Sequence, residues 1–334
     1  MELHGSLRPR LALTVGDPAG IGPEIVRAVL ADPASTRDAD VLAIGPASAR
    51  PDDVEEVRAN DRLVLSTFHG ARWLVTEGEP VEVGRVGANG GRAALAALRA
   101  ATDLCLARHL DGMVNGPVSK EALHLAGERV EGQTELLGRW ADARRMQMLA
   151  VAGRLRVLLL SRHMPLREAL DLVTEDRVTE HLLVLRDGLL EIGVANPRVA
   201  LAGLNPHAGE NGLLGTEDRD VLVPAAARAR ELGVDVTGPL SPDSVFLRAS
   251  KGEFDGVLAL YHDQAFIPTK LLRPRGGLTV LVGMPFVRVS PAHGTAMEIA
   301  GKGVADASNL LDAIVQAAEW AALRRSRRMR ERTI

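Results

Sequence analysis

Short apolar runs alternate with amphipathic stretches along most of the chain. The apolar run 11–15 stops at Gly16-Asp17-Pro18, and Pro23 then opens a stretch with helical periodicity. The same order recurs, which predicts repeated strand–helix units. Further expected strands are 41–44, 112–115, 199–203 and 256–260, and further expected helices are 93–109, 177–190, 218–232 and those beginning at Ser119, Thr134 and near Ser308.

One segment breaks this alternation. The apolar runs 146–151 and 155–160 flank Ala152-Gly153-Arg154, a pattern typical of an antiparallel hairpin. The predicted sheet is therefore not purely parallel.

Composition and length favour the α/β class. Of the 334 residues 46% are hydrophobic but only 3% aromatic, so the core must consist of Ala, Val and Leu, as in sheets that helices cover on both faces. Chains of this length usually divide, which predicts two lobes with a cleft between them.

Charge and hydropathy exclude some partners. The 40 Lys plus Arg and 43 Asp plus Glu give a formal net charge of −3, which provides no global attraction to nucleic acid or to a membrane surface. The N-terminal residues lack the apolar core of a signal peptide, and no apolar run approaches ~20 residues. A cytoplasmic location is expected.

Three of the nine histidines stand where a predicted strand gives way to a loop. They are His163, His207 and His262. Imidazole is a common ligand of transition metals, and three imidazoles with an open position suit a catalytic ion such as Zn²⁺. Asp263 beside His262 and the Pro- and Gly-flanked turn around His207 favour this interpretation. An ordinary hydrogen-bonded loop histidine remains the alternative for each.

The glycine-rich stretch 16–24 lies between a predicted strand and a predicted helix. Its backbone N–H groups could approach an anion, but it lacks Gly-Lys-Ser/Thr and the G-x-G-x-x-G spacing. A P-loop is excluded and a Rossmann cofactor site is disfavoured, which leaves a tight structural turn as the other interpretation.

Two cations follow later strand candidates. Lys270 and Arg288, with the turn 290–296, suggest an acidic or phosphorylated substrate, although either cation could be an ordinary surface residue. Asp243 could cap a helix or carry a proton.

Seven ordered motifs give the chain a resemblance to one family over nearly its whole length. They are LTVGDPAGIGPEIV at the start, NGPVSKEAL at 115–123, GQTELLG at 132–138, NPHAGENGLLGTED at 205–218, GPLSPDSVF at 238–246, YHDQAFIPTK at 261–270 and HGTAMEIAGKGVADASN at 293–309. These motifs resemble the NAD- and metal-dependent 4-hydroxythreonine-4-phosphate dehydrogenases of pyridoxine biosynthesis. The first and last also resemble signatures of the isocitrate and isopropylmalate dehydrogenases, a superfamily that holds NAD without the Rossmann fingerprint.

The resemblance implies a two-domain α/β/α, non-Rossmann fold with the active site in the interdomain cleft at the interface of a homodimer. Domain one, on the cofactor side, would comprise 1–127 with 284–334, and domain two, on the metal and dimer side, 128–283. The implied site residues are metal ligands His163, His207 and His262; acidic neighbours Asp243 and Asp263; substrate-binding residues Gln133, Thr134, Lys270, Thr279 and Arg288; and cofactor-binding residues Gly294, Thr295, Ala296 and Asn309.

Two substrate positions depart from the family pattern. Gln133 stands where the family has the His of GHTE, and Thr279 where it usually has Asn. Gln can donate a hydrogen bond but cannot carry charge, and Thr offers one hydroxyl in place of a two-ended amide. Both changes concern the substrate rather than the metal.

The resemblance implies oxidation of 4-phosphohydroxy-L-threonine by NAD or NADP, with Zn²⁺, or else Mg²⁺ or Co²⁺, lowering the pKa of the substrate hydroxyl. The resulting 3-keto acid would decarboxylate to 3-amino-2-oxopropyl phosphate. Lys270 or Asp263 is expected to transfer the proton, and Arg288 and Thr134 to orient the anionic groups.

Alternative substrates are threonate 4-phosphate, erythronate 4-phosphate and an aromatic dicarboxylate cis-dihydrodiol. A zinc hydrolase on the same histidines and a catalytically idle metal-binding scaffold are the alternatives from other classes.

Overall fold

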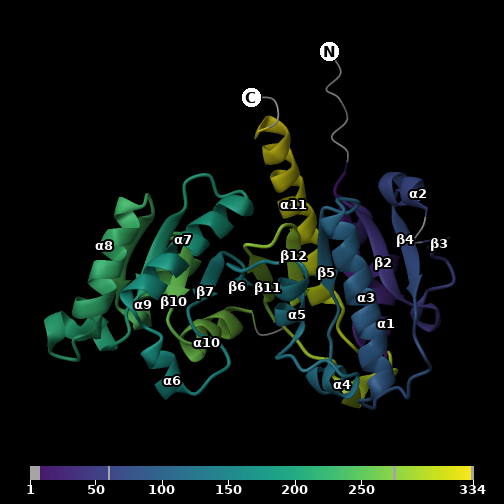
Figure 1. Cartoon of the computed structure of the whole chain (residues 1–334), viewed down its shortest axis with the longest axis horizontal. Coiled ribbons are helices and arrows are strands. Elements are labelled where there is room, and N and C mark those ends of the chain that lie inside the picture. The colour runs from purple at the N-terminus through teal and green to yellow at the C-terminus, as the bar shows by residue number, and fades with distance from the viewer. Residues whose placement is uncertain (1–7, 59–60, 274–275, 332–334) are drawn as a thin grey trace. The chain divides into compact units, whose positions relative to one another are not determined.

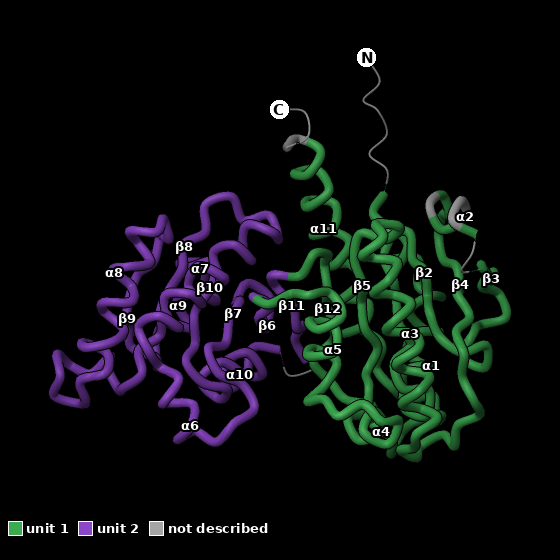
Figure 2. Tube along the Cα trace, in the orientation of Figure 1, with its two compact units in different colours: residues 1–144, 284–334 green, residues 145–283 purple. Residues whose placement is uncertain are grey.

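The computed structural model describes residues 8–58, 61–273 and 276–331, and these form two compact units. Unit 1 comprises Met1–Arg144 and Met284–Ile334, and unit 2 comprises Arg145–Gly283 (Figure 2). The chain thus leaves unit 1 and returns to it. The unit boundary lies at 144/145, whereas 127/128 is the expected one, and α5 (Gln133–Trp140) bonds to unit 1 through Gln133 to Gly116.

Unit 1 contains a parallel sheet in the order β3-β4-β2-β1-β5-β12 (Figure 1). Strands β1, β2 and β5 are buried along almost their whole length, as the apolar runs predict. Helix α3 packs on β1, β2 and β5 with α4, and α11 packs on β1, β5 and β12 and contacts α1. The bounds are β1 Arg10–Thr14, α1 Gly22–Ala31, β2 Asp40–Pro46, β3 Glu56–Val57, α2 Arg62–Thr67, β4 Ala71–Thr76, α3 Ala88–Leu106, β5 Gly112–Asn115, α4 Lys120–Leu125, β12 Val287–Pro291 and α11 Ser308–Glu331.

Unit 2 contains the strands in the order β11-β6-β7-β10-β8-β9. Strand β6 pairs antiparallel with β7 and β11, whereas β7, β10, β8 and β9 run parallel. Helices α9 and α10 pack on the central strands, and Phe246 and Phe254 fill the core among Ala, Val and Leu. The bounds are β6 Gln147–Ala152, β7 Leu155–Leu159, α6 Leu166–Asp171, α7 Glu175–Glu191, β8 Arg198–Ala202, α8 Val223–Glu231, β9 Asp235–Leu240, α9 Pro242–Ser250, β10 Gly256–Ala259, α10 His262–Leu272 and β11 Leu278–Val282.

The local sequence signals explain several of these bounds. Ser119 and Thr174 accept backbone N–H groups at the starts of α4 and α7, and a proline opens α1. Gly153 turns the predicted hairpin with φ 62°. The α/β class and the antiparallel interruption are therefore confirmed.

Within the described residues, no helix combines the length and the apolar content needed to cross a membrane.

Candidate functional site

Two of the expected metal ligands lie side by side in unit 2. His163 follows β7 by four residues, and His262 begins α10 three residues after the end of β10. Strands β7 and β10 are hydrogen-bonded parallel neighbours, so their carboxyl ends bring both histidines to one sheet edge. The centroids of the two imidazole rings are 5.4 Å apart. Sheet register therefore produces a contact between residues 99 positions apart in the chain.

The ring of His262 is held by its neighbours. Its Nδ1 lies 2.7 Å from Oδ1 of Asp263, and its centroid lies 4.6 Å from that of Phe266. A carboxylate can only accept, so Nδ1 is the donor in this contact, and in the neutral imidazole Nε2 is then the nitrogen that can bind a cation. Such carboxylate–imidazole pairs orient metal-binding histidines in proteins. Asp263, expected as a proton-transfer candidate, thus has an orienting contact here.

His207 lies on a turn of unusual backbone geometry. His207, Ala208, Glu210 and Asn211 all have positive φ values, at 54°, 53°, 45° and 58°. Left-handed geometry costs roughly 1–2 kcal/mol for each residue that carries a side chain. The sharp turn predicted around His207 is thus present in a form that needs support from its surroundings.

That support comes from Asp218, a buried carboxylate with 1% of its surface exposed. It accepts the backbone N–H groups of Leu204 and Asn205 at 2.8 and 3.0 Å and the Asn205 side-chain amide at 2.9 Å. These bonds fix the chain directly before the turn, and so the direction in which it enters His207.

The described residues do not assemble the expected three-histidine metal site. Among the described residues, no group of three or more His, Cys, Asp or Glu side chains is placed to hold an ion. The structure brings His163 and His262 together but does not join His207 to them in such a group. The donor chemistry of the pair nevertheless suits a divalent transition metal, because His262 offers a free imidazole nitrogen.

The remaining unit 2 candidates lie near this pair or on its helix. His262, Phe266 and Lys270 are spaced four residues apart, which places them on one side of α10, and Lys270 Nζ lies 5.9 Å from the Phe266 centroid. Asp243 is exposed in the first turn of α9, where its Oδ1 accepts the Ser241 hydroxyl at 2.6 Å. Thr279 is buried on β11, opposite Ala150 of β6.

A second polar cluster lies in unit 1 around Arg288. Arg288 is only 3% exposed, and its Nε donates to Oδ1 of Asn115 at 2.9 Å. Arg288 pairs with Met113 and Asn115 with Thr14 across neighbouring parallel strands. Paired residues share a sheet face, so Thr14, Asn115 and Arg288 project from one face. Thr14 and Asn115 lie at the carboxyl ends of β1 and β5, and Arg288 lies near the start of β12.

Burial lowers the pKa of the Arg288 guanidinium to about 10, while the charge of Glu135 acts in the opposite direction. The group therefore stays cationic at neutral pH and is poorly hydrated, which strengthens its attraction for an anion.

Helix α5 brings two further candidates to unit 1. Gln133 at its start donates Nε2 to the Gly116 carbonyl at 3.3 Å, directly beyond Asn115. Thr134, the next residue, is 8% exposed. Gln133 and Arg288 thus approach adjacent residues of the 115–116 turn from two elements, whereas Lys270 and Thr279 belong to unit 2.

One of the expected cofactor residues, Thr295, packs against the glycine-rich stretch. The Ile21 N–H donates to the Thr295 carbonyl at 2.9 Å, and a Cβ at Gly20 would lie 2.7 Å from the same oxygen. Ala296 has a left-handed φ of 42°, and Asn309 is buried near the start of α11. Gly294 has open space around its Cα. The stretch 16–24 therefore forms a close-packed turn beneath the 293–296 loop.

Sequence reasoning missed three residues of these clusters: Thr14, Asn115 and Asp218. Asn115 ends a predicted strand and Thr14 lies one residue before the end of another, and a polar residue at such a position is the signal that could have singled them out. In the sequence, Asp218 is identified only as the first residue of the expected helix 218–232.

Comparisons with known proteins agree with this organisation. The family model of the pyridoxal phosphate biosynthetic protein PdxA matches residues 26–317. The chain is 38% identical to a 4-hydroxythreonine-4-phosphate dehydrogenase of Geobacter metallireducens over 96% of this chain and 97% of that protein. It is 39% identical to a D-threonate 4-phosphate dehydrogenase of Salmonella typhimurium, over 93% and 98%.

A crystal structure of a 4-hydroxythreonine-4-phosphate dehydrogenase from Klebsiella pneumoniae superposes with a TM-score of 0.84, at 36% identity, over 95% of this chain and 99% of that chain. These relatives are dehydrogenases and match the chain almost from end to end. The chain therefore belongs to the PdxA family and is an oxidoreductase that acts on a CH–OH group.

Proposed function

We propose that this protein is an NAD-dependent, divalent-metal-dependent dehydrogenase that oxidises the 3-hydroxyl of 4-phosphohydroxy-L-threonine. The observation that carries the proposal is the imidazole pair, in which His163 lies against His262 and Asp263 leaves Nε2 of His262 free. Within a family of CH–OH dehydrogenases, that arrangement suits a cation at the substrate hydroxyl.

His163, His207 and His262 would hold the cation, with Zn²⁺ as the first choice and Mg²⁺ or Co²⁺ as alternatives. When bound, such a cation lowers the pKa of a hydroxyl that it contacts, and NAD⁺ or NADP⁺ accepts the hydride. Asp263 orients the His262 ring through Nδ1. Gly294, Thr295, Ala296 and Asn309 would contact the nicotinamide cofactor.

The reaction balances as the loss of one proton and one hydride. The hydroxyl proton passes to a protein base, for which Lys270, Asp263 and Asp243 are the candidates, and the hydride on the same carbon passes to the cofactor. The carboxylate of the product is β to the new ketone, so CO₂ can leave, and a proton from a protein acid or from water then replaces it on the α-carbon to give 3-amino-2-oxopropyl phosphate. Arg288, Thr134, Gln133, Lys270 and Thr279 would hold the carboxylate and the phosphate.

A second substrate class has specific support. The named D-threonate 4-phosphate dehydrogenase is as similar to the chain, at 39%, as the named 4-hydroxythreonine-4-phosphate dehydrogenase, at 38%. The departures at Gln133 and Thr279 also concern substrate positions. Threonate 4-phosphate, erythronate 4-phosphate and aromatic cis-dihydrodiols therefore remain the alternatives for the same chemistry.

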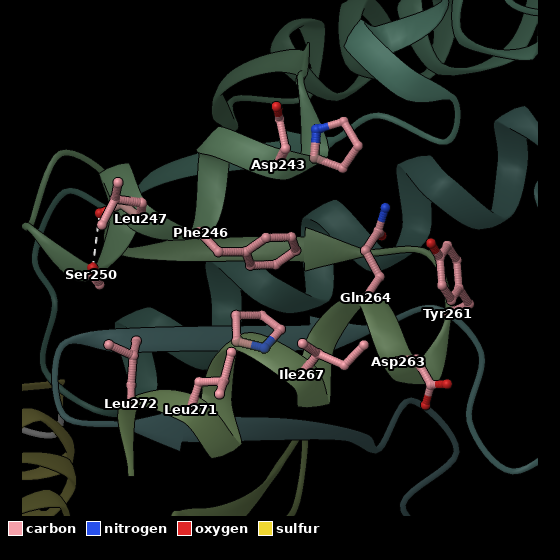
Figure 3. A pocket seen from close by; sticks show the side chains of 12 residues that line it. Asp243, Phe246, Leu247, Ser250, Tyr261, Asp263, Gln264, Ile267, Leu271 and Leu272 are labelled. Atoms are coloured by element: carbon pink, nitrogen blue, oxygen red, sulfur yellow. Dashed lines mark hydrogen bonds between the residues drawn. The ribbon is translucent and has the colours of Figure 1, made fainter. Parts of the chain in front are cut away.

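We also propose a homodimer with a shared active site. Helix α10 begins at His262 and then exposes Ile267 at 60%, Leu271 at 75% and Leu272 at 47%. With Phe246 and Leu247 of α9, these side chains line a cavity of about 490 Å³ (Figure 3). Exposed apolar surface of this kind marks association sites. A second subunit docked there would lie close to the proposed metal site, because Asp263, the neighbour of His262, also lines this cavity.

Subunit docking is tested by Leu271→Asp, with Leu125→Asp on the exposed surface of unit 1 as the matched control. Light scattering should give a dimer for the wild type and the control and a monomer for Leu271→Asp. A dimeric Leu271→Asp would contradict this interface.

The function is tested by NADH production from protein stripped of metal and reloaded with Zn²⁺, Mg²⁺ or Co²⁺. The four substrates are 4-phosphohydroxythreonine, threonate 4-phosphate, erythronate 4-phosphate and an aromatic cis-dihydrodiol. Metal-dependent NADH production with 4-phosphohydroxythreonine as the preferred substrate supports the proposal. Preference for one of the other three compounds supports the same reaction on a different substrate. Hydrolysis of an ester without NADH would favour a zinc hydrolase, and metal binding without either activity would favour an idle scaffold.

A further inference from the structure

Several buried polar atoms in the described part of unit 1 have no hydrogen-bond partner, and three of them belong to residues of the cluster around Arg288. These three are Thr14 Oγ1, Asn115 Nδ2 and Gln133 Oε1. Thr14 and Asn115 are fully buried and are paired residues of β1 and β5. Buried polar groups in proteins are nearly always satisfied, so a cluster of unsatisfied ones at strand ends indicates a place where a ligand bonds.

The donor or acceptor character of each free atom follows from its partners. Arg288 Nε can only donate, so Asn115 must present Oδ1 to it, and the remaining Nδ2 is a donor. The Gly116 carbonyl can only accept, so Gln133 must present Nε2 to it, and the remaining Oε1 is an acceptor. The cluster therefore offers a cation, an amide donor, an amide acceptor and a hydroxyl.

We propose that Asn115 is a substrate-binding residue, an inference that rests on the proposed function. Its Oδ1 fixes the plane of the Arg288 guanidinium, and its Nδ2 donates to the same anionic group of the substrate, a carboxylate or a phosphate. Gln133 Oε1 accepts from an amino or hydroxyl group beside that anion. This arrangement recognises a small anion that carries a neighbouring hydrogen-bond donor, which 4-phosphohydroxythreonine and threonate 4-phosphate both do.

The decisive variant is Asn115→Asp. It keeps the oxygen that holds Arg288 but replaces the free donor with a second carboxylate oxygen, which repels an anion and partly neutralises the guanidinium. The expected KM for the preferred phosphorylated substrate rises about 30-fold or more while kcat stays within about 3-fold. Asn196→Asp, the same charge change at an exposed loop of unit 2, should leave both constants unchanged.

A readout without turnover separates this inference from the proposed function. Inorganic phosphate should raise the thermal unfolding midpoint of the wild type and of Asn196→Asp but not that of Asn115→Asp. If the wild type makes no NADH from any of the four substrates, the proposed function fails while the phosphate measurement still tests Asn115.

The inference is overturned if Asn115→Asp keeps the wild-type KM and the wild-type phosphate shift, or if it lowers kcat alone. Should Asn115→Asp not fold, a crystal structure of the wild type with phosphate or substrate decides. A ligand oxygen within hydrogen-bond distance of Asn115 Nδ2 supports the inference, and a ligand bound elsewhere contradicts it.

Discussion

The polar clusters of the two units differ in one part of their construction, the turn that carries His207. In unit 1, Thr14, Asn115 and Arg288 are positioned by the register of adjacent parallel strands, so ordinary sheet geometry places a guanidinium and an amide together. In unit 2, His262 sits at a helix start and His207 on a left-handed turn. Strand register thus places both the Arg288 cluster and the His163–His262 pair, whereas His207 depends on a turn that Asp218 must hold.

The largest effect is expected at the strained turn. His207→Ala should lower kcat/KM by about 10³-fold or more, because a cation with an incomplete ligand set cannot activate the hydroxyl. His207 is exposed, so the unfolding midpoint and the dimer should persist. The measurements are turnover and bound metal, with His69→Ala on the surface of unit 1 as the control. A variant with normal metal content and normal turnover would remove His207 from the site.

The second-largest effect is expected from substitution of Arg288, the cation of the unit 1 cluster. Arg288→Lys keeps the charge but loses the planar fork, so the bond to Asn115 and bidentate contact with an anion cannot both form. The KM should rise about 100-fold with a smaller change in kcat. Arg248→Lys, at an exposed ion pair with Glu253, is the matched control. Equal kinetics for the two variants would show that the guanidinium geometry is unimportant.

A smaller effect is expected from the support of the turn. The Asp218 carboxylate accepts three N–H groups, and in Asp218→Asn the new side-chain NH₂ would face one of them. Because that hydrogen bond is lost, the free energy of unfolding should fall by about 2 kcal/mol. It should also weaken Zn²⁺ binding by about 10-fold, as loss of an orienting residue does. Calorimetry would measure both, with the exposed Asp220→Asn as control. If Asp218→Asn bound Zn²⁺ with wild-type affinity, the support that Asp218 gives to the turn would have no influence on metal binding.

The smallest effect concerns the glycine-rich stretch of unit 1. Burial raises the pKa of Asp17, although the Ala19 N–H opposes the shift, so the fold favours the protonated carboxyl. Its contribution to stability is complete below the unfolded pKa of about 3.9 and is lost as pH rises through the folded pKa.

Asp17→Asn keeps the oxygen that accepts Ala19 N–H but cannot ionise. The variant should therefore exceed the wild type in unfolding midpoint most at about pH 8, and the difference should shrink toward about pH 4. A difference that is constant with pH, measured by thermal unfolding in matched buffers, would contradict this assignment. Asp103→Asn on the exposed face of α3 should show no such trend.

The helices and strands with a clear period of hydrophobic positions could be predicted from the sequence. The run 112–115 became β5 residue for residue, and the hairpin around Gly153 formed as expected, because alternation and turn residues act locally. Sheet order was not predictable, because pairing joins distant segments such as β5 and β12.

The same distinction explains the candidate sites. The residue types at His163 and His262 were visible in the sequence, but their contact depends on β7 lying beside β10. For residues 207–211 the sequence predicts a sharp turn but not the series of positive φ values. The support for that backbone comes from Asp218, which lies further along the chain. The role of Asn115 as a partner of Arg288 could not be predicted, since it depends on a bond across two strands.

The division between the two clusters is tested most directly by a crossed binding experiment. Wild type, His262→Ala and Arg288→Lys are each titrated by calorimetry with Zn²⁺ and, separately, with inorganic phosphate. We predict that His262→Ala loses Zn²⁺ binding and keeps phosphate binding, while Arg288→Lys weakens phosphate binding and keeps Zn²⁺ binding. Loss of both ligands in either variant, or of neither in both, would contradict the account.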